Sequence, residues 1–324
     1  MSVTEASHIQ HADILSFADE RVNLKRERVK KYRDQVQNVR DHIERYIKEN
    51  PDTGLVKTLL SGSLAKGTAL RSLNDVDVAL YIKADTAPTE QGKLLEWLRQ
   101  ELMRTYPQKD SSDIYIDGPC VVIAFTGTGL NVDIAPVYYD GDEQDRGFLW
   151  DRFTGEKVLT SIPLHLQFIR KRKGEHNSHY AQVIRLLKWW VKQREATDSS
   201  FKLRSFLIEL IVAHLADDGM AFSDYVEALK SFFLYVTKSE LSDRIAFTDY
   251  YSVSQIPEPT NRPIEIFDPV NPKNNVAGDY TTRDRDAIVV AAEEALEALI
   301  YAQRATTKGE TVECWQDVLG TSFN

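Results

Sequence analysis

Residues 60–82 read LSGSLAKGTALRSLNDVDVALYI. From Asp75 onward every second residue is apolar, and this period of two predicts a β-strand. On such a strand Asp75 and Asp77 share one face, with backbones roughly 6.5–7 Å apart. Two like charges at that spacing repel and suit a strand poorly, and a divalent cation bound between them would offset this cost. The alternative interpretation is an edge strand with two solvated aspartates.

A third aspartate lies on a later strand candidate, residues 130–137 (LNVDIAPV), where Asn131, Asp133 and Ala135 share one face. If this strand pairs beside the first, Asp133 joins Asp75 and Asp77. Three clustered carboxylates can hold two Mg²⁺ ions about 3.5–4 Å apart, which activate an attacking hydroxyl and stabilise a leaving pyrophosphate.

Gly62 and Ser63 follow a short strand candidate at residues 56–60 and precede a short helix or turn. Glycine lets the backbone approach a phosphate closely, and the free amides and the Ser63 hydroxyl can donate hydrogen bonds to it. Gly62–Ser63 together with the Asp75–Asp77 strand indicates a phosphate and metal site more specifically than either motif does alone.

The rest of the sequence predicts an α+β protein with two lobes. A long helix within residues 20–50 carries one apolar stripe and precedes an α/β lobe with a mixed sheet, in which residues 121–125 and 130–137 form a hairpin. From about residue 162 helical segments dominate (residues 179–194, 203–216, 223–237 and 285–304), and prolines mark an irregular connection before the last. We therefore expect lobes at residues 1–160 and 161–324.

Composition restricts the cellular setting. The chain has 324 residues, a formal charge of −9 and two distant cysteines, Cys120 and Cys314, which fit a reduced cytoplasmic protein. No signal peptide or membrane helix is expected. The net charge argues against coating of long nucleic acid, although small nucleotides remain possible. The basic run 170–173 and the pair His176 and His179 are expected to be solvated surface residues.

The segment 60–78 resembles the signature of polymerase-beta-like nucleotidyltransferases: Gly-Ser, a spacer, Asp-hydrophobic-Asp-hydrophobic, and a third Asp on a later strand. Residues 267–276 (FDPVNPKNNV) are similar to the Asp-Pro-x-x-Pro-x-Asn-Asn stretch of the oligoadenylate-synthase branch. We expect this stretch to be a structural turn with Asx-type hydrogen bonds. Together the motifs resemble the bacterial oligonucleotide cyclases related to cyclic GMP-AMP synthase, and within them the HORMA-associated clade of anti-phage defence.

The resemblance implies a role for each matching residue. Gly62 and Ser63 would hold the donor phosphates, and Asp75, Asp77 and Asp133 would bind Mg²⁺, in a cleft between the α/β lobe and the oligoadenylate-synthase-like helical lobe. The family's triphosphate-binding Lys and Ser match Lys188 and Ser205. Read from the residues alone, Lys188 could instead extend to solvent, and Ser205 could be an N-cap of the following helix.

The resemblance also implies an activity: magnesium-dependent synthesis of a cyclic oligonucleotide second messenger from ATP, alone or with another nucleoside triphosphate, with an adenine-containing cyclic trinucleotide favoured. The implied partners are a HORMA-domain regulator and its AAA-type ATPase, with nucleic acid as an activator only through that partner. Two alternatives remain: an enzyme with a linear product (2′–5′ oligoadenylate or tRNA-end type), and an inactive nucleotide-binding scaffold.

Overall fold

The computed structural model describes residues 8–151 and 155–324. The chain divides into two compact units: Leu24–Phe168, and the residues up to Asn23 together with Ile169–Asn324. This division differs from the expected one at 160/161, because the unit changes inside helix α5 (Ile162–Thr197). The early residues group with the later helices through contacts such as the Asn23 amide to Gln182, at 2.9 Å.

The first unit contains a mixed sheet with the order β1-β2-β5-β4-β3, extended by β6 on β5 and β7 on β6. The predicted strands and the hairpin are confirmed, and β2 runs parallel to β5 while β4 runs antiparallel to it. The strands are β1 (Leu55–Leu60), β2 (Asp75–Lys83), β3 (Ile114–Asp117), β4 (Cys120–Phe125), β5 (Leu130–Tyr139), β6 (Gly147–Trp150) and β7 (Lys157–Thr160).

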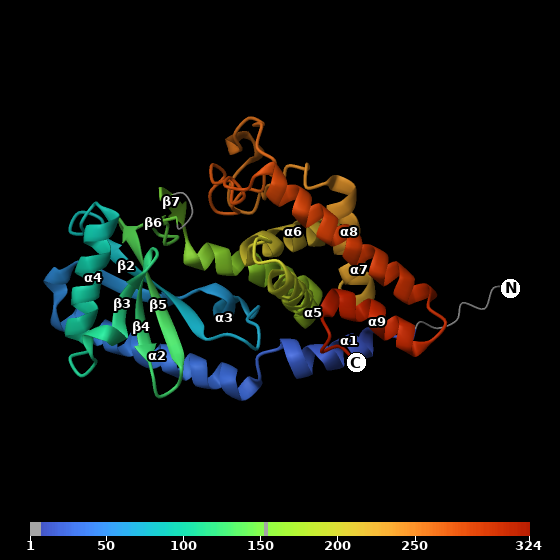
Figure 1. The fold of residues 1–324 in the computed structure, drawn as a ribbon. Coiled ribbons are helices and arrows are strands. Elements are labelled where there is room, and N and C mark those ends of the chain that lie inside the picture. Colours follow the sequence, from blue (N-terminus) through green and yellow to red (C-terminus); the bar gives the residue numbers. More distant parts are fainter. Residues whose placement is uncertain (1–7, 152–154) are drawn as a thin grey trace. The chain divides into compact units, whose positions relative to one another are not determined.

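One face of this sheet is covered by α2 (Arg26–Glu49) and α4 (Gln91–Thr105), as Figure 1 shows. The predicted stripe on α2 is confirmed, because Tyr32, Val36, Val39 and Ile43 are buried in the core that α2 shares with the sheet and α4. The helix begins at Arg26 because a π-helical turn (Ala18–Val22) and extended residues precede it. The short helix α3 (Gly62–Lys66) joins β1 to β2.

The second unit is helical. It contains α1 (His11–Phe17), most of α5, α6 (Ser205–Asp217), α7 (Tyr225–Ser239), α8 (Thr282–Arg304) and α9 (Lys308–Leu319). Trp190 and Phe233 meet in its core with ring centroids 4.9 Å apart. The sequence interpretation missed α9, whose signals are a Thr307–Glu310 capping box and a buried stripe ending in Trp315 and Leu319. Among the helices that the structure describes, none has the length and apolar character needed to cross a membrane.

The basic run 170–173 needs a correction. Arg172 is only 1% exposed, and its guanidinium pairs with Asp217 at the end of α6 and with Asp249 in the irregular region after α7. The prediction of a fully solvated run was wrong at this position, because an arginine can be buried where carboxylates neutralise it. This ion-pair cluster joins three segments of the helical unit.

The two histidines of α5 are half-buried in aromatic contacts. His176 lies against Phe222 with ring centroids 4.7 Å apart, and the His179 Nδ1 atom lies 2.9 Å from the Tyr225 hydroxyl. The prediction that both histidines are solvated was therefore wrong, because they pack α5 against Phe222 and Tyr225.

The expected structural turn at residues 267–276 is confirmed. Asp268 Oδ1 accepts the Val270 amide at 2.8 Å, and Asn275 Oδ1 accepts the Ile266 and Ala277 amides at 3.1 and 3.0 Å. The bonds from Val270 and Ala277 are Asx-type, because each joins a side chain to the amide two residues later, whereas the Ile266 bond ties the turn to an earlier segment.

Candidate active site

The two aspartates of β2 lie on an internal strand. β2 is hydrogen-bonded to β1 on one side and to β5 on the other, so the edge-strand interpretation was wrong. Asp75 and Asp77 are exposed while Val76 and Val78 are buried in the core beneath α2 and α4. The carboxylates therefore lie on the sheet face opposite those helices.

The strand register brings the third aspartate beside them. Asp77 is the direct partner of Asp133, and Asp75 is the partner of Asn131. Neighbouring strands lie about 4.8 Å apart, so Asp77 and Asp133 are adjacent on one face. The predicted pairing of the two strands is confirmed, and it places three carboxylates and one amide on a single surface.

The Gly62–Ser63 turn packs directly onto this surface. The Ser61 amide donates to the Asp77 carbonyl at 2.9 Å, and Gly62 follows with φ +63°. A Cβ atom at Gly62 would lie 1.7 Å from Asp77 Oδ2. Glycine is required here by both the backbone conformation and the approach of the carboxylate. The turn is thus packed against Asp77, so a phosphate bound at the turn would lie next to the carboxylates.

The donor atoms of this face suit magnesium. Mg²⁺ prefers oxygen ligands and is usually held by one or two carboxylates together with water and substrate phosphates. Asp77 and Asp133 supply such a pair, with Asp75 two residues along β2. As the side chains lie, no three His, Cys, Asp or Glu residues within the described ranges form a ready-made metal cage. The arrangement fits a magnesium ion that is bound partly by these carboxylates and partly by the phosphates of a nucleotide.

The same sheet face continues into a buried cluster. Ala79, Tyr81 and Val137 pack together, and the Tyr81 hydroxyl donates to the Asp145 carbonyl at 3.1 Å. Burial raises the pKa of Tyr81, so the phenol remains neutral at physiological pH. The Lys57 ammonium pairs with Asp145 and lies 4.7 Å from the Tyr139 ring centroid. This cluster lies in the later halves of β2 and β5, where Tyr81 pairs with Val137, beyond the carboxylates along both strands.

Lys188 lies on α5 in the helical unit. It is 6% exposed, and its Nζ atom lies 2.7 Å from Oε1 of Glu209, which is 2% exposed. The interpretation of a lysine extending to solvent was wrong, because a buried carboxylate pairs with it. Sequence reasoning missed Glu209, although a glutamate inside the apolar run of α6 was a usable signal for such a pair.

Ser205 is the exposed first residue of α6. The N-cap position belongs to Arg204, whose backbone is extended at φ −66° and ψ 143°, so the N-cap interpretation of Ser205 was wrong. Ser205 therefore presents its hydroxyl in the first turn, where backbone amides lack helical partners. Lys188 and Ser205 belong to one unit, and the carboxylates with Gly62–Ser63 belong to the other.

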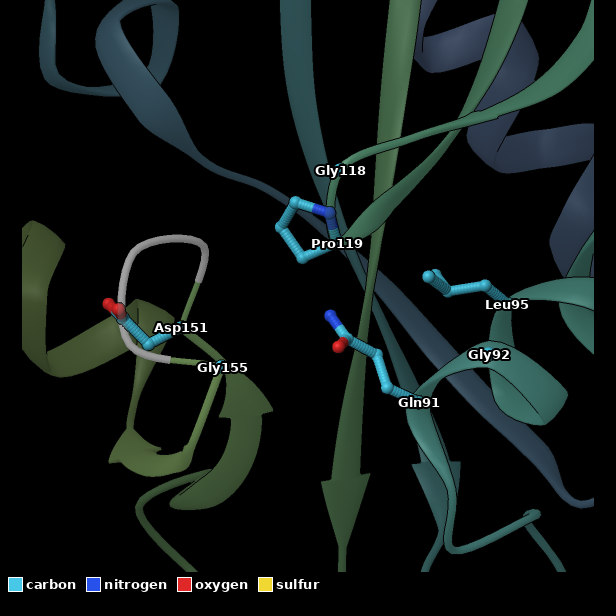
Figure 2. Close-up of a pocket in the computed structure, with 7 residues that line it drawn as sticks. All are labelled: Gln91, Gly92, Leu95, Gly118, Pro119, Asp151 and Gly155. Carbon is cyan, nitrogen blue, oxygen red and sulfur yellow. The ribbon is translucent and has the colours of Figure 1, made fainter.

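A surface pocket of about 310 Å³ lies elsewhere in the sheet unit (Figure 2). None of the predicted site residues lines it. The residues that line it come from the start of α4, the β3–β4 turn and the β6–β7 connection: Gln91, Gly92, Leu95, Gly118, Pro119, Asp151 and Gly155.

The mixed sheet followed by helices is an α+β fold of the polymerase-beta-like nucleotidyltransferase class. A family model described as the Second Messenger Oligonucleotide or Dinucleotide Synthetase domain matches residues 9–148. The cyclic AMP-AMP-AMP synthase of Escherichia coli (strain MS 115-1) is 43% identical over 316 residues, which cover 98% of each chain. The chain belongs to this family of second-messenger oligonucleotide synthetases.

Two solved structures extend the comparison. A structure of E. coli MS115-1 CdnC with ATP matches with a TM-score of 0.94 and 43% identity, covering 98% of this chain and 99% of that one. A complex of the same CdnC with HORMA-deltaN matches with a TM-score of 0.93 at the same identity and coverage. The similarity therefore extends through both units.

Proposed function

We propose that this protein joins nucleoside triphosphates into a cyclic oligonucleotide second messenger in anti-phage defence. A ribose hydroxyl attacks an α-phosphate and pyrophosphate leaves, and a later attack within the product closes the ring. An adenine-containing cyclic trinucleotide is the favoured product, in line with the name of the 43% identical relative. The observation that carries the proposal is the shared face of Asp75, Asp77 and Asp133 with Gly62 packed on Asp77.

Each part of the site has a task in this reaction. When bound by Asp75, Asp77 and Asp133, magnesium supplies the charge that activates the hydroxyl and stabilises the leaving pyrophosphate. Gly62 has no side chain to obstruct a phosphate, and the Ser63 hydroxyl can donate to one. In the helical unit Ser205 offers its hydroxyl to the donor triphosphate. Lys188 has three ammonium donors, so it can keep Glu209 and still donate to a phosphate oxygen.

The proposal includes a regulator. A relative at 43% identity is solved in complex with HORMA-deltaN, so we propose a HORMA-domain partner for this chain as well. An AAA-type ATPase acting on that partner, activation by nucleic acid through it, and a cytoplasmic location belong to the same proposal.

The test is to incubate the full chain with ATP, GTP, CTP, UTP and Mg²⁺, followed by phosphatase treatment and mass analysis. A phosphatase-resistant product is expected, because a ring has no terminal phosphates. A ladder of phosphatase-sensitive chains would replace the proposal by a linear-product enzyme. If no product forms even with a HORMA partner and DNA present, the result would favour a nucleotide-binding scaffold without catalytic activity.

A further inference from the structure

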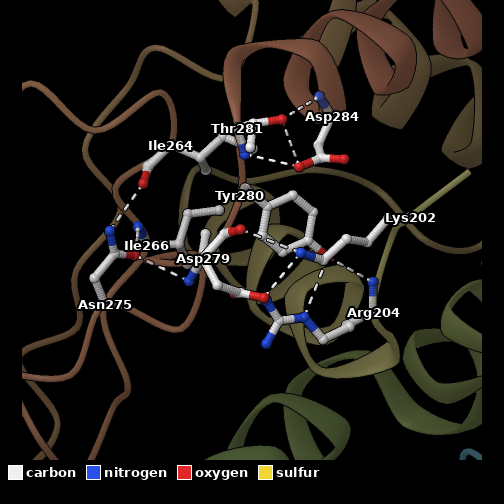
Figure 3. Close-up of polar contacts among 10 residues, drawn as sticks. Lys202, Arg204, Ile264, Ile266, Asn275, Asp279, Tyr280, Thr281 and Asp284 are labelled. Atoms are coloured by element: carbon white, nitrogen blue, oxygen red, sulfur yellow. Dashed lines mark hydrogen bonds and ion pairs between the residues drawn. The ribbon is translucent and has the colours of Figure 1, made fainter. Parts of the chain in front are cut away.

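Two consecutive residues, Asp279 and Tyr280, hold the segment that leads into α6 (Figure 3). The Asp279 carboxylate pairs with Lys202, at 2.8 Å between Nζ and Oδ2, and with the Arg204 guanidinium. The Tyr280 hydroxyl accepts the Arg204 backbone amide at 2.9 Å. Arg204 is the N-cap residue of α6, so these contacts fix the backbone immediately before Ser205.

The Tyr280 ring adds a second restraint. The Lys202 Nζ atom lies 4.4 Å from its centroid and the Arg204 Cζ atom lies 4.8 Å from it. Such distances allow cation–π attraction, which strengthens where water is excluded. Tyr280 itself is 2% exposed, while the three charged partners are roughly one quarter exposed. The Lys202 and Arg204 side chains thus lie over a buried aromatic ring, and Asp279 pairs with both of them.

The dipeptide is itself rigidly held on both sides. Before it, Asn275 bonds the Ile264 carbonyl at 2.9 Å and the Ile266 amide at 3.1 Å, and the Tyr280 amide donates to the Ala277 carbonyl at 3.0 Å. After it, Thr281 caps α8 and bonds Asp284 reciprocally. The asparagine turn and the start of α8 therefore fix the position from which Tyr280 contacts α6.

We propose that Asp279 and Tyr280 are positioning residues for Ser205, which set the first turn of α6 for the triphosphate of the donor nucleotide. The inference rests on the proposed function, because it assigns Ser205 to that triphosphate. Asp279 and Tyr280 act through Arg204 without touching the substrate. Binding depends on donors held within a fraction of an ångström, so a loosened α6 start weakens affinity even though Ser205 is unchanged.

The experiment measures the equilibrium affinity of the full chain for α,β-methylene ATP with Mg²⁺, which requires no turnover. Tyr280→Phe keeps the ring and removes the acceptor of the Arg204 amide. We expect binding to weaken about fivefold to twentyfold, because the loosened start of α6 must then be ordered when the nucleotide binds. The matched control is Tyr251→Phe, because the Tyr251 hydroxyl also accepts a backbone amide, that of Phe247 at 3.3 Å. Tyr251→Phe should lower the free energy of unfolding about as much as Tyr280→Phe does, and it should leave the affinity for the analogue unchanged.

A double-mutant cycle separates positioning from general destabilisation. If Tyr280 acts through Ser205, Tyr280→Phe combined with Ser205→Ala binds the analogue about as weakly as the weaker single variant. Additive losses, an unchanged affinity of Tyr280→Phe, or equal losses in both tyrosine variants would overturn the inference. Absence of analogue binding by the wild type would overturn it too, whereas bound analogue without any NTP turnover would overturn only the proposed function.

Discussion

Gly62 and Asp77 depend on each other at the scale of single residues. The glycine adopts φ +63°, and any Cβ atom there would lie inside the van der Waals contact distance of Asp77 Cβ, Cγ and Oδ2. The turn can approach a phosphate only because this position lacks a side chain, and Asp77 can keep its orientation for the same reason. The proposed phosphate and metal functions therefore share one steric requirement.

Gly62→Ala is predicted to displace Asp77 as well as strain the backbone. The matched control is Gly129→Ala, because Gly129 has φ +66° but no atom within 4 Å of an added Cβ. Both variants should lose about 1–2 kcal/mol from the left-handed backbone. Gly62→Ala should lose roughly a further 1–3 kcal/mol from overpacking, and also its NTP turnover. Urea unfolding and pyrophosphate release measure the two effects, and equal behaviour of the two variants would contradict the account.

Residues with a strong local signature were predictable from sequence. Strand alternation placed Asp75 and Asp77 on one face, and Asp133 was predicted to join them if its strand paired beside the first, as it does in the structure. The pairing of Lys188 with Glu209 was not predicted, because the two residues lie on different helices and periodicity says nothing about which helix faces which.

At the scale of elements, the helical unit is joined by buried ion pairs. The Lys188–Glu209 pair links α5 to α6, and both side chains are almost fully buried. Removing one partner leaves an uncompensated charge in the interior, which costs far more than loss of an exposed pair.

Lys188→Met is predicted to destabilise the protein by about 3–5 kcal/mol, because Glu209 is left buried without its cation. Lys30→Met is the matched control, since Lys30 pairs with Asp34 while 80% exposed and should change stability little. Denaturant unfolding compares the two. A small loss in Lys188→Met would mean that Glu209 has adequate other partners.

The Arg172 cluster predicts a pH dependence. Burial of Asp249 opposes ionisation, but hydrogen bonds and charge from Arg172, aided by Lys171, hold the pKa of Asp249 below its ordinary value. A lowered folded-state pKa stabilises the protein above the unfolded value of about 3.9, and that contribution is lost as the pH falls through the folded pKa. The stability difference between wild type and Asp249→Asn should therefore be full near neutral pH and shrink below about pH 4. Urea titrations at a series of pH values measure it, and a difference independent of pH would refute this assignment.

The periodicity of apolar residues predicted which helices and strands exist, but it did not predict the residues at which they begin and end. The apolar stripe of α2 was predicted, but its start at Arg26 was not, because nothing in residues 20–25 is incompatible with a helix. Burial of Arg172 could not be predicted for a related reason: its partners Asp217 and Asp249 lie 45 and 77 residues away in sequence.

At the scale of the whole molecule, the proposed site residues are divided between the two units. The carboxylates and the Gly62–Ser63 turn belong to the sheet unit, and Lys188 and Ser205 belong to the helical unit. The cleft location remains a prediction from the family resemblance. The motifs predicted the class of fold and the carboxylate face, whereas grouping of the residues up to Asn23 with the later helices depends on long-range packing that no local pattern encodes.

The most direct test of the account compares wild type with an Asp75→Asn/Asp77→Asn variant for product formation from ATP, GTP, CTP, UTP and Mg²⁺. We predict a phosphatase-resistant product from wild type and at least about a 100-fold loss in the variant, since both removed groups are proposed metal ligands. The variant should remain folded, because the substitutions remove like charges that share one sheet face, including Asp77 directly opposite Asp133. Undiminished product from a folded variant would contradict the carboxylate mechanism, and an unfolded variant would show that the two aspartates are structural.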